Sequence, residues 1–185
     1  DQSGNVLVAM DTPDYARPGI DFVVLPLYSV QTGSKEVAEK SGINQWNAGG
    51  RQRKFGEAYI PIPSEVHRLC PGFFPGRDVK FDMYLPNSPS SVQAKVCQQG
   101  GKALMSDPNT VLGNWIMRVL RPVLSDVDFS RFPNKTDKPF SYRELDAIGK
   151  DSVVVRKRRD KSVTSFSVEF AGVGRYEEFI SDLSF

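Results

Sequence analysis

The chain has 185 residues, with 24 Lys and Arg against 22 Asp and Glu and a formal net charge of +2. Its hydrophobic content of 39% and its twelve Phe suffice for a buried core and exclude a disordered tail. Near-neutral overall charge means that any basic surface for a polyanion has to be local. This length suits one domain, and the start at Asp1 in place of Met suggests a piece of a longer protein.

Cysteine usage and hydropathy narrow the class of protein. Cys70 and Cys97 are the two cysteines, and neither belongs to a C-x-x-C pair or has a His at zinc spacing. The sequence predicts no metal site and two buried free thiols, as in a reducing cytoplasm. No apolar run approaches the roughly 18 residues of a membrane span, and no signal peptide is visible. We expect a soluble, intracellular protein without a membrane partner.

In chain order, residues 1–20 place several Gly and Pro around one short apolar patch and indicate a linker or an added edge strand. Beyond them, short β-type runs begin. The six clear predicted strands span residues 21–29, 58–62, 79–85, 92–96, 152–156 and 163–170. The runs VKFDMYL and TSFSVEF alternate apolar and polar residues, as half-buried antiparallel strands do.

Three helices are predicted between the strands. The first covers residues 64–69 with Ser64 as its cap, and the second covers about residues 107–120, where apolar residues fall on one face. The third begins at a capping box formed by Ser141 and Glu144. Two of these helices are too short to cross between parallel strands, so the pattern favours a mainly β, antiparallel barrel of six or seven strands with helices plugging its ends.

Residues 44–54 form the most distinctive polar segment, with three positive charges, four side-chain amides, one indole, two glycines and no acid. Arg pairs with guanine edges or phosphates, Asn and Gln pair with adenine edges, and Gly permits close backbone approach. The alternative is an ordinary polar surface loop. The candidate DNA-binding residues in this segment are Asn44, Gln45, Trp46, Asn47, Arg51, Gln52, Arg53 and Lys54.

A second polar loop, residues 93–106, repeats this composition with two lysines, three glutamines, two adjacent glycines and no acid. Two such loops are less expected by chance than one, and on the same side of a barrel they would flank a duplex. The second loop adds the candidates Lys95, Gln98, Gln99 and Lys102. A third basic cluster, Arg156–Arg159 with Lys161, lies at a predicted hairpin tip, where solvated charge is favoured and phosphate contact is the alternative.

Catalytic alternatives are weaker. His67 and Cys70 have the helical spacing of a dyad, but a surface histidine near a buried cysteine is the strongly favoured explanation. Asp78 and Lys80 imitate part of a metal-dependent nuclease site. Neither a nucleophile elbow nor a phosphate-binding glycine motif occurs. We predict no catalytic residue, with an RNA or single-strand binding module or a small nuclease as the alternatives to duplex recognition.

Three stretches resemble the carboxy-terminal region of NgoFVII-type restriction endonucleases: residues 58–67 (AYIPIPSEVH), 73–75 (FFP) and 100–106 (GGKALMS). The resemblance covers about residues 25–170. It implies that residues 21–185 form a seven-stranded antiparallel B3-like pseudobarrel with short helices at its ends. Two arms of such a domain enter the major groove of double-stranded DNA.

The resemblance places arm 1 at residues 44–54 and arm 2 at residues 95–106, which adds Ser106 to the candidates. It also implies a phospholipase D-like nuclease domain amino-terminal to this chain, an ATP-dependent helicase-like partner subunit and a bacterial cytoplasmic location. The nuclease motif needs His-x-Lys, whereas His67 is followed by Arg68 and Leu69. This chain is therefore expected to lack the catalytic domain and to need no cofactor.

Overall fold

The computed structural model describes residues 20–31, 33–47, 49–124, 126–132, 138–159 and 164–184. The linker or edge strand predicted over residues 1–20 lies outside these ranges except for Ile20, and Lys161 of the third basic cluster lies outside them as well. No helix within the described ranges is long and apolar enough to cross a membrane.

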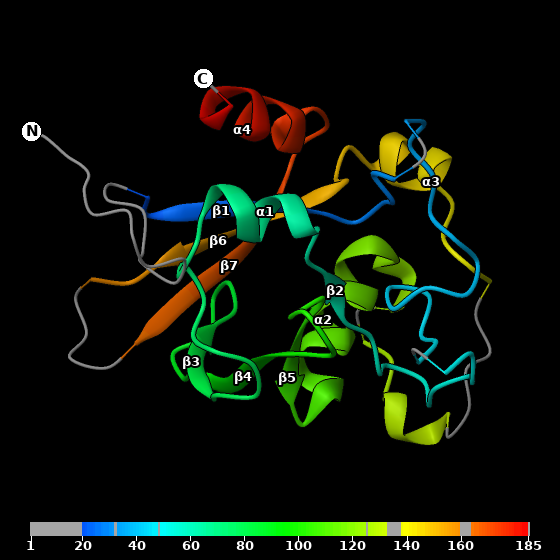
Figure 1. The fold of residues 1–185 in the computed structure, drawn as a ribbon. Coiled ribbons are helices and arrows are strands. Elements are labelled where there is room, and N and C mark those ends of the chain that lie inside the picture. Colours follow the sequence, from blue (N-terminus) through cyan, green and yellow to red (C-terminus); the bar gives the residue numbers. More distant parts are fainter. Residues whose placement is uncertain are drawn as a thin grey trace, which may run out of the picture.

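Seven strands of the described chain form one sheet (Figure 1). The strands are β1 Phe22–Pro26, β2 Ile60–Pro61, β3 Phe81–Tyr84, β4 Val92–Cys97, β5 Ala103–Asp107, β6 Ser152–Lys157 and β7 Ser165–Ala171. Their spatial order is β1-β6-β7-β3-β4-β5-β2. The last two strands of the chain therefore join β1 to β3 in the middle of the sheet.

The sheet is mixed, and the prediction of an antiparallel barrel is wrong for one pair of strands. β3 pairs with β7 in parallel, with Met83 opposite Phe166, while the other five ladders are antiparallel. Alternation along a strand shows which side chains face the core, but it carries no information on the direction of the partner strand. The sheet curls into a half-barrel. Residues of the edge strands β1 and β2 approach within 8 Å between Cα atoms, yet no ladder joins them in the described part of the chain.

Four α-helices and two 3-10 helices accompany the sheet in the described ranges. They are α1 Ser64–Leu69, α2 Asn109–Leu120, η1 Pro122–Leu124, η2 Phe129–Arg131, α3 Tyr142–Ile148 and α4 Arg175–Leu183. The capping box of α3 is confirmed: the Ser141 side chain accepts from the Glu144 N–H, and the Glu144 side chain accepts from the Ser141 N–H. The predicted cap of α1 is wrong, because Pro63 occupies the N-cap position and Ser64 is the first helical residue.

The core lies against the concave sheet and is rich in aromatic rings. Phe73 and Phe74 from the loop after α1 pack on Phe81 and Phe166, with ring centroids 4.9–6.4 Å apart. Burying each such side chain contributes about 1.5–3 kcal/mol. α4 lies beside α1 in Figure 1, and the Tyr176 hydroxyl donates to Glu65 Oε2 at 3.2 Å between them. These contacts hold the loop after α1 against the sheet and α4 against α1.

Candidate nucleic-acid interface

Arm 1 folds back on itself as a small hairpin in the connection between β1 and β2. Trp46 and Gln52 form an antiparallel bridge, and the Asn47 N–H donates to the Arg51 carbonyl at 2.9 Å. The Asn47 side chain closes the tip, because its Oδ1 accepts from the Arg51 N–H at 2.8 Å. Gly50 supplies the left-handed backbone of the turn, with a φ of 78°. The tip is therefore braced by its own hydrogen bonds.

The base of arm 1 is held by two buried amide side chains. Asn44 Nδ2 donates to the carbonyls of Ala38 (2.9 Å) and Phe140 (3.1 Å), and its Oδ1 accepts from the Phe140 N–H at 2.6 Å. Gln45 Oε1 accepts from the Gly56 N–H at 2.5 Å. Both side chains are almost fully buried, at 1% and 0% exposure. Their hydrogen-bonding groups thus anchor the arm to the protein.

Two further side chains of arm 1 stack within the protein. The Arg53 guanidinium lies 5.8 Å from the centroid of the Tyr59 ring, and that ring covers Gly42, where a Cβ would approach it to 2.3 Å. The Trp46 ring is half-buried, and Lys40 Nζ lies 5.1 Å from its centroid. These contacts orient Arg53 and fix the indole against the arm.

Arg51, Gln52 and Lys54 present their side chains to solvent. Arg51 and Lys54 form no ion pair within the described ranges. Arg53 is half-buried and its guanidinium stacks on Tyr59. Arm 1 therefore offers one exposed and one half-buried guanidinium group.

Arm 2 is a strand hairpin, and the prediction of a polar loop over residues 93–106 is wrong for most of its length. Lys95 lies half-buried in β4 and Ser106 lies buried in β5, so that only residues 98–102 form the turn. The two adjacent glycines and the polar composition are typical of a loop, but the short run ALMSD that follows the glycines forms β5. Arm 2 is thus shorter and more rigid than a loop of that length.

The turn of arm 2 is tight. Gln98, Gly100 and Gly101 have left-handed backbone, with φ values of 68°, 79° and 66°, and the Gly101 N–H donates to the Gln98 carbonyl at 2.9 Å. Gln99 and Lys102 are exposed on it, and Lys102 forms no ion pair with any described residue. The turn therefore carries one amide and one ammonium group toward solvent.

Ser106 has a different role from the exposed residues. Its Oγ accepts from the Leu112 N–H at 2.9 Å and donates to the Pro108 carbonyl at 2.8 Å. These bonds tie the end of β5 to the first turn of α2, where no side chain occupies a capping position. Ser106 as a residue is only 1% exposed, so it supports arm 2 from within the protein.

Charged side chains from both arms act electrostatically on Cys97, the last residue of β4. Burial raises the pKa of its thiol; Lys95 lowers it, Asp78 raises it, and Arg53 and Arg77 lower it. Arg53 of arm 1 and Lys95 of arm 2 thus both lie within electrostatic reach of this thiol. Arg77, in the loop between α1 and β3, joins them, although the sequence did not single it out.

A sequence model of the NgoFVII C-terminal B3-like DNA-binding domain matches residues 22–138, more than half of the chain. The chain belongs to this family. The match confirms the resemblance found in the sequence, and it contains both arms. A search of curated proteins finds no match to the chain.

The third basic cluster of this B3-like DNA-binding domain makes contacts inside the protein. Arg156 lies 5.0 Å from the centroid of the Phe22 ring, and Arg159 forms an ion pair with Asp21. Charges engaged in this way are less available to a polyanion than those of Arg51 and Lys102 on the arms.

Lys80 and His67, which were considered for catalysis, bind other groups of the B3-like domain. Lys80 Nζ binds Asp107 at 2.7 Å and not Asp78, and this bond is the main reason why the pKa of the Asp107 carboxyl lies below its usual range. His67 Nε2 lies 2.7 Å from the Gly101 carbonyl oxygen. No group of three or more His, Cys, Asp or Glu in the described ranges has the arrangement of a metal site.

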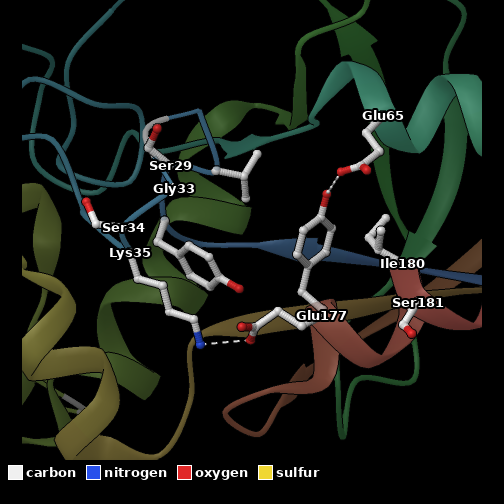
Figure 2. Close-up of a pocket in the computed structure, with 11 residues that line it drawn as sticks. Ser29, Gly33, Ser34, Lys35, Glu65, Glu177, Ile180 and Ser181 are labelled. Carbon is white, nitrogen blue, oxygen red and sulfur yellow. Dashed lines mark hydrogen bonds and ion pairs between the residues drawn. The ribbon is translucent and has the colours of Figure 1, made fainter. Parts of the chain in front are cut away.

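A cavity of about 370 Å³ lies between α1, α4 and the segment that follows β1 (Figure 2). Figure 2 shows Lys35 and Glu177 facing each other across it, and their ion pair measures 2.8 Å. The carboxylate of Glu65, also labelled there, accepts from the Tyr176 hydroxyl at 3.2 Å. The hydrogen bond that Lys35 donates to Glu177 is the main cause that raises the pKa of Lys35. These groups satisfy one another, and they fasten α4 to the B3-like domain.

Proposed function

We propose that this B3-like domain recognises a specific sequence of double-stranded DNA, with arm 1 and arm 2 both entering the major groove. One observation carries the proposal: two hairpins, each braced by its own hydrogen bonds, expose Arg51, Lys54 and Lys102 without ion-pair partners in the described chain. Charge of this kind attracts phosphates, while rigid hairpins bring long side chains to base edges at little entropic cost.

Arg51 and Arg53 are the proposed guanine readers, because a guanidinium donates two parallel hydrogen bonds to O6 and N7. Stacking on Tyr59 restricts Arg53 before it binds, so less freedom is lost in the complex. The proposed secondary base readers are Gln52, Gln98 and Gln99, and the proposed phosphate contacts are Lys54, Lys95 and Lys102.

The other candidates receive supporting roles in this proposal. The polar groups of Asn44, Gln45 and Ser106 are buried and bonded to backbone, and the Asn47 side chain closes the tip of arm 1. Trp46 packs as part of the arm. Such residues position the contacts that the exposed side chains make.

We further propose that the domain is the target-recognition part of a restriction endonuclease in the bacterial cytoplasm. Family membership supports this proposal. A phospholipase D-like nuclease domain and an ATP-dependent helicase-like subunit would then belong to the rest of the system, and this domain would need no cofactor for binding.

A competition gel shift tests the proposed substrate. Labelled duplex from a randomised pool is bound by the purified domain and competed with unlabelled duplex, single-stranded DNA or RNA of the same composition. The proposal predicts that duplex competes best. A preference for single strands or RNA would refute it and would favour a single-strand binding module.

The variants Arg51→Ala and Arg53→Ala test the assigned readers on a selected site. Each should lose about 1–3 kcal/mol of binding free energy on that site and relax specificity at one base pair. Arg143→Ala is the control, because Arg143 is exposed on α3. Equal losses on selected and random duplex would make Arg51 or Arg53 a phosphate contact.

A further inference from the structure

A second hollow of the surface, about 560 Å³ in volume, lies beside the turn of arm 2. Gly100 and Gly101 of the turn form one wall, and the loop after α1 forms the other with Phe74 and Arg77. Several positions around it are glycines, so backbone is accessible on both walls. The hollow has room for a phosphate together with an attached sugar.

The two walls are linked by a histidine. His67 of α1 donates from Nε2 to the Gly101 carbonyl oxygen at 2.7 Å. A Cβ at Gly101 would lie 3.0 Å from Val96 Cγ1 and 3.1 Å from His67 Nε2, and its φ of 66° already favours glycine. The bond and the tight packing hold the turn of arm 2 at a fixed distance from the loop that carries Arg77.

The charge of the hollow suits an anion. Its described lining includes the Arg77 guanidinium and no carboxylate. Asp78, just outside the lining, approaches Arg77 at 3.6 Å, with both side chains 56% exposed. An ion pair that is long and solvated leaves most of the hydrogen-bonding capacity of the guanidinium unused.

We propose that this hollow seats one phosphodiester of the DNA backbone, with its deoxyribose against Phe74, and that Arg77 is the phosphate ligand. The inference rests on the proposed function, because an arm lying in the major groove has backbone phosphates on either side of it. A contact of this kind carries no base information. It sets the register and depth at which arm 2 enters the groove.

The variant Arg77→Gln tests this contact, and Arg68→Gln is the matched control. Arg68 lies on α1 next to His67, is 68% exposed and pairs with Glu65, but it does not line the hollow. Binding of the purified domain is measured at several salt concentrations on a selected duplex and on a random duplex. The proposal predicts that Arg77→Gln weakens both by the same factor, roughly tenfold.

The slope of log affinity against log salt should also fall in magnitude by about 0.9 for Arg77→Gln and stay unchanged for Arg68→Gln. An unchanged slope, or a loss confined to the selected duplex, overturns the assignment. Ethylation interference supplies a second measurement. Ethylation of one phosphate should weaken DNA binding by the parent domain, and the same ethylation should not weaken binding by Arg77→Gln any further. The salt slope on random duplex tests the Arg77 contact even if the arms recognise no sequence. The phosphate contact and sequence recognition can therefore fail separately.

Discussion

Gly113 of α2 is the position where a single methyl group would displace arm 1. A Cβ there would lie 1.8 Å from the Gly56 carbonyl oxygen and 2.6 Å from the Ala58 nitrogen, both backbone atoms of the segment that leads from arm 1 into β2. The shortest separation is 1.6 Å below the 3.4 Å at which ordinary contact begins. Backbone cannot rotate away as a flexible side chain does, so the segment has to shift.

Gly113→Ala should therefore cost about 1–3 kcal/mol of unfolding free energy, as overpacking usually does. That loss lowers the midpoint of thermal unfolding by about 2–4 °C for each kcal/mol in a chain of this size. Because Gln45 bonds Gly56, the same shift reaches the base of arm 1, and affinity for a selected duplex should fall about tenfold or more.

Thermal unfolding and a fluorescence binding titration measure the two effects on Gly113→Ala. Gly172→Ala is the control, since its Cβ would meet nothing nearer than the Gly149 carbonyl at 3.9 Å. If Gly113→Ala kept both the stability and the DNA affinity of the parent, the claim that α2 positions arm 1 would be refuted.

Three further predictions concern single side chains. Asn44→Ala strands buried backbone groups of Phe140 and should lower the unfolding free energy by about 1–3 kcal/mol in urea denaturation; an unchanged midpoint would contradict this. Gly42→Ala should push the Tyr59 ring off Arg53, so adding Arg53→Ala should weaken DNA binding little further; additive losses would show that the stack is unimportant. Burial, the largest cause, raises the pKa of the Asp151 carboxyl above 3.8, so the folded state favours the neutral acid. The stability from this shift is fully present below pH 3.8 and is lost as the pH rises through the folded-state pKa. The melting temperature of the parent should therefore fall relative to that of Asp151→Asn over this pH range; a constant difference, or a parent that gains relative to the variant, would contradict the assignment.

Features encoded by neighbouring residues were predictable from the sequence. The capping box of Ser141 and Glu144 needs residues only three apart, and it specifies the start of α3. The sequence of α4 contains a comparable local signal, although α4 is not among the three predicted helices. Tyr176, Phe179, Ile180 and Leu183 are spaced as one helical face, and the first two are buried.

Features that depend on distant residues were not predictable. Asn44 has the composition of a base reader, but its partner Phe140 lies 96 residues away, and only the fold brings them together. The parallel pairing of β3 with β7 likewise depends on strands far apart in the chain. The sequence gives no signal for Arg77, because the adjacent Asp78 offsets its charge. Its relevance depends on the turn of arm 2, which the fold places beside it.

The sheet of the domain extends beyond the residues that the family model matches. The family match ends at residue 138, yet β6 and β7 follow it and separate β1 from β3 in the sheet. β6 contributes Val153, Val154 and Val155 to the core, all buried to 5% exposure or less. The half-barrel that carries the arms therefore requires residues beyond the matched region.

Methylation interference on a duplex selected from a randomised pool tests the central claim most directly. Dimethyl sulfate methylates guanine N7 in the major groove and adenine N3 in the minor groove, so the two grooves are probed in one experiment. Arms in the major groove predict that N7 methylation at particular guanines blocks binding and that Arg51→Ala or Arg53→Ala removes the effect at one of them. Interference confined to adenine N3, or none at any base, would contradict recognition through the major groove.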